Sequence, residues 1–263
     1  MFSINKIYDT VIRWPAIRKL YYYRMDWAAA RHNRHTLDLV YEIDDLNYAY
    51  YQKVREVGSV ELEHQIGRLM NMKEIIKNCI PLKGDFIEFG TWRGFSLLWI
   101  AYFLQRNALF DRKLVGLDGF SGLPHDDGVF RKGTFSNVTL KMCRRNVLDN
   151  KILYPEIRKN IFVDRFSFSE KEKIIVYLRH NNISKFCFMH IDCDIYQSVI
   201  EIFDILKEGD LIADRACILF DDYGWQSKLA PTVDDIFERM RDNWEISTHS
   251  YTRYTKNFLL AKK

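Results

Sequence analysis

One stretch, GDFIEFGTWRGFS at residues 84–96, constrains the fold of this chain more than any other. Apolar residues typical of a strand lead to the acid Glu88, two glycines follow at Gly90 and Gly94, and a helical spacing of apolar residues begins at Leu97. This order predicts a strand, a tight turn and a helix. Glycine allows a ligand to lie against the turn, the helix start offers free N–H groups, and the acid would repel phosphate while accepting hydrogen bonds from an amine or hydroxyls. The stretch therefore predicts a site for a nucleoside that carries a cation, with an ordinary strand-to-helix turn as the alternative.

Strands and helices alternate beyond Cys79. The expected strands are 85–89, 114–118, 160–164, 186–192, 217–221, 244–250 and 257–262, and the expected helices are near 95–106, 136–149, 169–181, 198–208 and 231–242. The central strands are apolar on both faces, as buried parallel strands are. The predicted fold class is therefore α/β, with a doubly wound, mostly parallel seven-stranded sheet that ends in a strand hairpin. Ser198 and Glu201 have the spacing of a capping box for the fourth helix, and Gly209 marks its end.

The predicted domain boundary lies at residue 78. Residues 1–78 are expected to form an N-terminal helical appendage that acts as a lid or mediates oligomerisation, and residues 79–263 the ligand-binding domain. Residues 1–35 carry seven Lys and Arg against two acids, together with several aromatic residues. Such a segment is typical of peripheral membrane contact, of a helix that covers a cleft, or of a subunit contact in a homo-oligomer. The rest of the chain is close to neutral, which argues against a nucleic-acid partner.

Composition also bears on location. No apolar run reaches the roughly 18 residues needed to cross a bilayer, and the N-terminus has no secretory apolar region. Five cysteines, an odd number without a CxxC pair, are typical of reduced thiols. We therefore expect a soluble protein in the cytoplasm.

Four of the predicted strands end in an acid, at Glu88, Asp118, Asp192 and Asp221. In an open α/β sheet, ligands bind beyond the carboxyl ends of the strands, so these side chains are expected to converge on one crevice. Asp118 follows the second strand, where an acid can accept hydrogen bonds from both ribose hydroxyls. Asp164 ends the third strand and could reach an adenine amino group.

Two further segments, HIDCDIYQS and ILFDDYG, predict a metal site. They would bring Asp192, Asp221 and Asp222 to the ends of adjacent strands as oxygen ligands for a hard cation such as Mg²⁺. Without an ion, so much like charge would repel and raise pKa values. Asp194 is interpreted as a cap of a turn or helix. His190 is interpreted as a core histidine, with a role as a base as the alternative.

With these residues assembled, the chain resembles the macrocin O-methyltransferase (TylF/MycF-like) family of class I S-adenosylmethionine-dependent enzymes. The resemblance covers roughly residues 65–262, and its motifs, in the expected order, are GDFIEFGTWRG (84–94), LDGFSGLP (117–124), HIDCDIYQS (190–198) and FDDYGW (220–225). In that family the first motif has the form ExGxWRG, and Trp92 fits the tryptophan of that variant. The charged segment 210–216 departs from the family pattern as an insert before the fifth strand.

The resemblance implies a Rossmann-like fold, S-adenosylmethionine as cofactor and a sugar-containing acceptor. The residues expected at the cofactor are Glu88, Phe89, Gly90, Thr91, Trp92, Ser96, Asp118, Gly119 and Asp164. Asp192, Asp221 and Asp222 would hold Mg²⁺ or another divalent cation, which would bind neighbouring sugar hydroxyls and lower their pKa. Asp192 is the nearest candidate for the catalytic base.

Two other functions stay open. Asp192-Cys193-Asp194 is also a DxD motif, which could hold a metal and a nucleotide diphosphate in a glycosyltransferase. That interpretation leaves ExGxWRG and the Asp221-Asp222 pair unexplained. A non-catalytic partner-binding module is the other alternative, although the acids that such a module would lose first are all present.

Overall fold

The computed structural model describes residues 52, 60–127, 130–224 and 228–263. The chain divides into two compact units, Met1–Asn47 and Tyr48–Lys263, and every described residue belongs to the second. The predictions made for residues 1–35 lie outside the described residues. Among those that are described, no helix combines the length and the hydropathy that a bilayer crossing needs.

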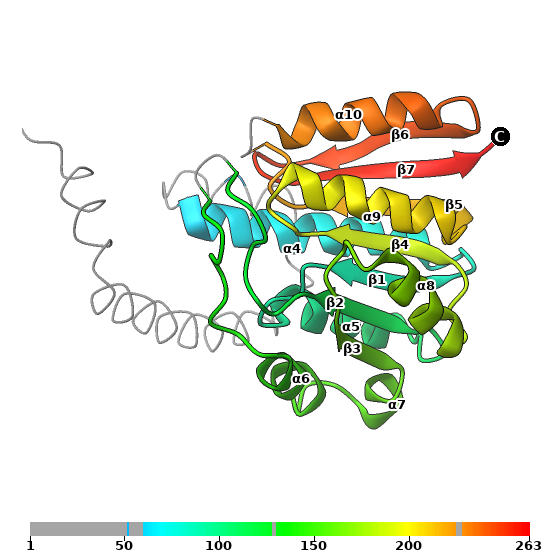
Figure 1. Cartoon of the computed structure of the whole chain (residues 1–263). Helices are drawn as coiled ribbons and strands as arrows, with labels where there is room; N and C mark the ends of the chain where they lie inside the picture. Colours follow the sequence, from blue (N-terminus) through cyan, green and yellow to red (C-terminus); the bar gives the residue numbers. More distant parts are fainter. Residues whose placement is uncertain (1–51, 53–59, 128–129, 225–227) are drawn as a thin grey trace, which may run out of the picture. The chain divides into compact units, whose positions relative to one another are not determined.

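A seven-stranded sheet with the order β3-β2-β1-β4-β5-β7-β6 forms the centre of this unit (Figure 1). Its strands are β1 (Asp85–Phe89), β2 (Leu114–Asp118), β3 (Ile161–Arg165), β4 (Phe186–Ile191), β5 (Ile212–Phe220), β6 (Trp244–Tyr251) and β7 (Lys256–Lys262). The first five pair in parallel, whereas β7 runs antiparallel to both β5 and β6. The predicted doubly wound sheet with a terminal hairpin is therefore confirmed.

Helices cover both faces of the sheet (Figure 1). They are α4 (Val60–Cys79), α5 (Phe95–Arg106), α6 (Leu140–Leu148), α7 (Pro155–Arg158), α8 (Lys171–His180), α9 (Tyr196–Glu208) and α10 (Leu229–Met240). On one side, α5 contacts α4, α6 and α7, and on the other α9 lies between α8 and α10. All six residues of β4 are buried between these layers, as expected for a central parallel strand.

The start of α9 differs from the prediction. The helix begins at Tyr196, its cap residue Ile195 makes no side-chain cap hydrogen bond, and Ser198 is buried inside the helix. The capping-box prediction is therefore wrong. The chain reverses at Asp194, which has a positive φ of 61°, and the free N–H of Tyr196 is bound by the Asp127 carboxylate at 3.3 Å. The predicted end is confirmed, because Gly209 directly follows Glu208.

Most of the charged segment 210–216 is not an insert before β5, because residues 212–216 form the start of that strand. Phe186 of β4 pairs with Ile212, and Phe188 pairs with Cys217, so β5 bulges between these pairs. Within the bulge, Arg215 pairs with β7. The apolar pattern of the sequence does not indicate a strand here, because the charged side chains in this part of β5 are exposed.

Candidate active site

The turn after β1 lies directly against the end of β4. Gly90 has φ +90° and its N–H donates to the Leu117 carbonyl at 2.9 Å. A Cβ at this position would lie only 1.7 Å from the carbonyl oxygen of Asp192. The turn therefore excludes any side chain at Gly90, and α5 begins five residues beyond this glycine, directly after Gly94.

Glu88 lies fully buried beneath this turn, beside β4. The Ser96 hydroxyl donates to Glu88 Oε1, and His190 Nδ1 lies 3.2 Å from the same oxygen. Burial alone would lower the pKa of His190, but its hydrogen bond to Glu88 and the nearby carboxylates outweigh this and raise it. Among the described residues, Glu88 Oε2 and His190 Nε2 are buried and have no hydrogen-bond partner. The second carboxylate oxygen is therefore left to accept a hydrogen bond from a ligand.

The remaining residues predicted to bind the cofactor surround this turn. Asp118 accepts hydrogen bonds from the N–H groups of Trp92 at 2.8 Å and Phe120 at 2.6 Å, while burial raises the pKa of its carboxyl. A Cβ on Gly119 would make only ordinary van der Waals contacts, the nearest with the Ser121 hydroxyl at 3.4 Å. Phe89 and Thr91 differ from these residues, because both side chains are buried in the interior and only their backbone can reach a ligand at this turn.

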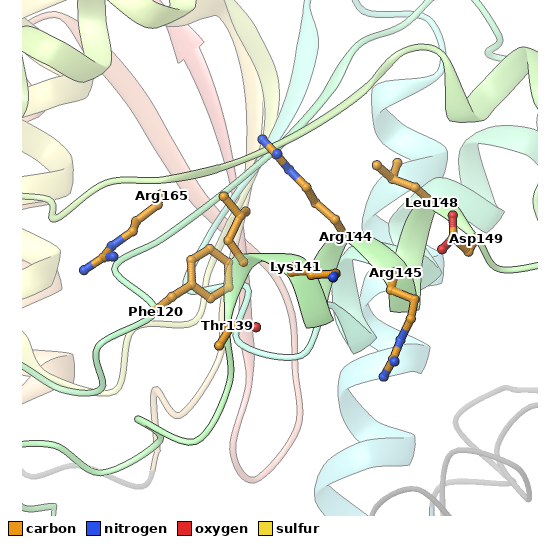
Figure 2. A pocket seen from close by; sticks show the side chains of 9 residues that line it. Phe120, Thr139, Lys141, Arg144, Arg145, Leu148, Asp149 and Arg165 are labelled. Atoms are coloured by element: carbon orange, nitrogen blue, oxygen red, sulfur yellow. The ribbon is translucent and has the colours of Figure 1, made fainter.

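A cavity of about 630 Å³ opens beside Asp118, between the residues that follow β2 and β3 and the helix α6. Figure 2 shows Phe120, Arg144 and Arg165 around it. Asp164 contacts two residues that line the cavity, because Arg144 Nη2 is 3.6 Å from its carboxylate and the Arg165 N–H donates to it at 2.9 Å. None of the predicted cofactor residues lines this cavity, but Asp118 is hydrogen-bonded to the N–H of Phe120 and Asp164 precedes Arg165, and these two neighbours do line it.

Four aspartates gather at the carboxyl ends of β4 and β5. Asp192, Asp194 and Asp222 each offer an oxygen within 4.8 Å of the other two, and Asp194 is hydrogen-bonded to Asp222. Burial and mutual repulsion raise the pKa of all three, that of Asp194 to about 8. Of the interpretation of Asp194 as a cap of a turn or helix, the helix alternative is wrong, because the cap residue of α9 is Ile195. The Asp194 side chain belongs to this acidic cluster, which we define as Asp192, Asp194, Asp221 and Asp222.

Two side chains of α4 supply positive or hydrogen-bonding partners to the acidic cluster. Arg68 Nη1 lies 2.7 Å from Asp192 Oδ2 and 2.9 Å from Asp221 Oδ2. His64 Nε2 lies 3.0 Å from Asp221 Oδ1 and 3.7 Å from Asp222 Oδ1. Burial would raise the pKa of Asp221, but Arg68 and His64 hold it well below its ordinary range. Arg68 therefore joins two of the predicted metal ligands, and His64 adjoins the third.

No motif in the sequence pointed to His64 or Arg68 as site residues. His64 and Arg68 are four residues apart and so lie on one face of α4, while the apolar residues of that helix are buried against the sheet. A polar pair at this spacing on a buried helix is the signal that could have identified them.

The donor set of the cluster suits a divalent cation. Carboxylate oxygens are the ligands that Mg²⁺ and Ca²⁺ prefer, and His64 Nε2 with Asp221 and Asp222 forms a second group within 4.8 Å that mixes nitrogen and oxygen. The Arg68 guanidinium already provides one positive charge there. A bound ion would therefore share the cluster with this side chain.

The chain is similar to one known protein family and to several solved structures. A family model described as Macrocin-O-methyltransferase (TylF) matches residues 65–248. The solved structure titled "Structure of the O-methyltransferase NovP" is 20% identical, with a TM-score of 0.61 over 75% of this chain and 81% of that one.

A structure of CalS11, the calicheamicin methyltransferase, is 15% identical, with a TM-score of 0.61 over 76% of this chain and 82% of that one. An apo structure of CalS11, titled as a TDP-rhamnose 3'-O-methyltransferase, gives a TM-score of 0.53 at 15% identity, over 76% of this chain and 83% of that one. No curated protein matches the sequence. The sheet and its helices have the Rossmann-like fold of class I methyltransferases.

Proposed function

The chain belongs to the macrocin O-methyltransferase (TylF) family and is an O-methyltransferase, and on this premise we propose that it methylates a sugar hydroxyl with the help of a divalent cation. The observation that carries the proposal is the contact between the glycine turn and the acidic cluster. A Cβ on Gly90 would lie 1.7 Å from the carbonyl oxygen of Asp192, so the cofactor turn and the first metal-binding aspartate share one edge of the sheet. A donor and an acceptor bound at these two places would be neighbours.

The residues around the turn fit S-adenosylmethionine. The unpartnered oxygen of Glu88 can accept a hydrogen bond from an ammonium group, and Asp118 keeps lone pairs for ribose hydroxyls. The adenine would lie in the cavity of Figure 2 against Phe120, within reach of Asp164. When bound, this cofactor supplies a methyl group on a sulfonium, which is open to in-line attack by an oxygen.

The acidic cluster fits a divalent cation through Asp192, Asp221 and Asp222. The ion would offset the repulsion that raises the pKa of Asp192 and Asp222, and its Lewis acidity would make a sugar hydroxyl easier to deprotonate. Asp192 adjoins the turn and is the proposed acceptor of the hydroxyl proton. Arg68 would keep Asp192 in place, since it binds the carboxylate at 2.7 Å.

The sugar acceptor rests on the family and on one neighbour of the same fold. CalS11 is titled as a TDP-rhamnose 3'-O-methyltransferase, which means that this arrangement of sheet and helices can accommodate a sugar substrate. Carboxylates with a divalent ion bind neighbouring hydroxyls well, and such pairs of hydroxyls are common on sugars.

Removal of one metal-binding aspartate tests the proposal. We expect Asp221→Asn to lower methyl transfer at least about 100-fold, because the ion loses a buried anionic ligand, while the affinity for S-adenosylhomocysteine changes less than about threefold. The measurements are isothermal titration calorimetry and transfer of a labelled methyl group to a panel of sugars. Asp214→Asn is the matched control, since Asp214 lies on the same strand with its side chain exposed.

Two outcomes would contradict the proposal. Full activity in excess EDTA would remove the metal from the mechanism. Tight binding of a nucleotide sugar, with no binding of S-adenosylmethionine or S-adenosylhomocysteine, would favour the glycosyltransferase alternative instead.

A further inference from the structure

A second cavity, of about 400 Å³, adjoins the acidic cluster on the side of the β6–β7 hairpin. Its wall begins at Tyr223 and Gly224, which directly follow Asp222, and continues on the hairpin. The hairpin turn lies against this wall, because a Cβ on Gly224 would be 2.2 Å from the carbonyl oxygen of Arg253. The cavity therefore opens one residue away from a proposed metal ligand.

The same turn is connected to the cluster through α4. The ring of Tyr254 packs on His64 with 5.1 Å between the ring centroids, and His64 Nε2 is 3.0 Å from Asp221. Asn71, one turn beyond Arg68, donates to the Thr255 hydroxyl at 2.6 Å. Helix α4 thus contacts both the hairpin turn and the acidic cluster.

The cavity has the opposite charge to the cluster. Its eight lining residues include Arg253, Lys256 and several hydroxyl groups, but no Asp or Glu; the Arg253 guanidinium is 4.0 Å from the Glu63 carboxylate, so Lys256 carries the argument. Tyr251, with 70% of its surface exposed, provides an aromatic side. The four acids and the cavity that holds the Lys256 ammonium therefore both lie beyond the end of β5.

The contacts of the Lys256 side chain indicate that its ammonium group is available to bind a ligand. Its ammonium lies 4.6 Å from the ring centre of Tyr223 and 4.9 Å from that of Phe258, and it is 3.4 Å from the Tyr223 hydroxyl. No carboxylate within the described part of the chain forms an ion pair with it. An ammonium placed on aromatic rings keeps N–H donors available, and a carboxylate or phosphate accepts such donors more strongly than a neutral hydroxyl.

We propose that this cavity binds an anionic group, a carboxylate or a phosphate, carried by the sugar acceptor. The inference rests on the proposed function and adds the chemical class of its substrate. The acceptor would be oriented by opposite charges, with its hydroxyls at the acidic cluster and its anion at Lys256. Such an arrangement selects one orientation, since the reverse would place an anion among four aspartates.

Calorimetry with matched sugars tests this inference. In the presence of Mg²⁺ and S-adenosylhomocysteine, the probes are glucose, glucuronic acid, glucose 1-phosphate and a nucleoside diphosphate glucose. We expect at least one acidic probe to bind at least about tenfold more tightly than glucose, with a preference that weakens as salt is added. The carboxylate and phosphate probes together identify which anion the cavity takes.

Variants of the ammonium group locate the effect. Lys256→Met keeps an aliphatic chain over the two rings but removes the charge, and it should abolish the tenfold preference. Lys256→Arg should restore most of it, and Lys262→Met, an exposed lysine farther along the same strand, should leave it unchanged. Affinity for S-adenosylhomocysteine should stay constant in all three variants.

Three results would overturn the inference. They are equal affinity of the wild-type protein for glucose and its acidic derivatives, no binding of any acidic probe at millimolar concentration, and a preference that survives in Lys256→Met. The first and second need no variant and so do not depend on how Lys256→Met folds. If the wild-type protein did not bind S-adenosylhomocysteine at all, that result would instead contradict the proposed function.

Discussion

Each aspartate of the acidic cluster has a protonation state set by its own neighbours. Asp221 contacts Arg68 and His64, which lower its pKa, whereas Asp194 is buried beside Asp192 and has its pKa raised to about 8. Two aspartates that lie only a few ångströms apart therefore favour opposite protonation states. A divalent ion would favour the charged form of all of them.

We expect the metal-free protein to lose stability as the pH rises from about 5 to 8. An unfolded aspartate titrates near 3.8 and folded Asp194 near 8, so in this range the folded state holds the extra proton. The free energy of unfolding then falls with rising pH, by up to about 1.4 kcal/mol per pH unit for one such proton. Asp221 acts in the opposite sense, but only below its unfolded pKa, outside this range.

Urea unfolding in EDTA at several pH values measures this slope. Asp194→Asn should reduce it, because the group that takes up the proton is gone. Asp210→Asn is the control, since Asp210 is exposed and Lys185 lowers its pKa, so it does not titrate in this range. An unchanged slope in Asp194→Asn would contradict the prediction.

Gly90→Ala should destabilise the protein by about 3 kcal/mol or more. The new Cβ would combine a left-handed backbone conformation with an overlap against the Asp192 carbonyl oxygen. Gly133→Ala separates the two effects, because Gly133 has φ +81° but nothing within 4 Å of a Cβ, and it should cost only about 1 kcal/mol. Equal losses in urea unfolding would show that the contact with β4 is unimportant.

Helix α4 contributes both to the packing of the fold and to the candidate active site. It packs on β5 and α5, and its polar face carries the side chains that bind the acidic cluster and the hairpin turn. This helix was assigned to the N-terminal appendage by the predicted boundary at residue 78. The lid role of that appendage concerns residues that the structure mostly does not describe, and it stays a prediction.

Arg68→Gln should lower the free energy of unfolding of the metal-free protein by about 3 to 5 kcal/mol. It would leave Asp192 and Asp221 without the cation that lies within 2.9 Å of both. Added Mn²⁺ should recover more stability in this variant than in the wild type, because the competing charge is absent. Thermal unfolding with and without Mn²⁺ makes the comparison.

Lys77→Gln on the same helix provides the control. Lys77 forms an exposed pair with Glu74, so its loss should change stability by less than about 0.5 kcal/mol. If Arg68→Gln behaved like this control, the guanidinium would have no part in balancing the cluster.

At the scale of the whole molecule, the described residues form one compact unit that starts near Tyr48. Deletion of residues 1–47 should therefore leave binding of S-adenosylhomocysteine within about threefold of the full chain. If the basic and aromatic N-terminus contacts membranes, the deletion should also abolish co-sedimentation with vesicles that contain phosphatidylserine. Unchanged co-sedimentation would exclude that role, and cytoplasmic location and homo-oligomerisation stay predictions.

Local sequence patterns were sufficient to predict the strand, turn and helix around Gly90, the order of strands and helices, and the meeting of Asp192, Asp221 and Asp222 in the acidic cluster. These features follow from local rules, since periodicity reports burial and an acid at the end of a parallel strand must lie at the carboxyl edge of the sheet. These rules did not predict the first residues of β5, because the exposed charged residues there do not alternate with apolar ones.

The partners of the acidic cluster depend on tertiary contacts that the sequence does not reveal. Arg68 and Asp192 are separated by 124 positions, and His64 and Asp221 by 157 positions. No local pattern relates residues so far apart, because their contact depends on how α4 packs across the sheet. The same holds for the cavity at Lys256, which exists because the hairpin turn packs beside the end of β5.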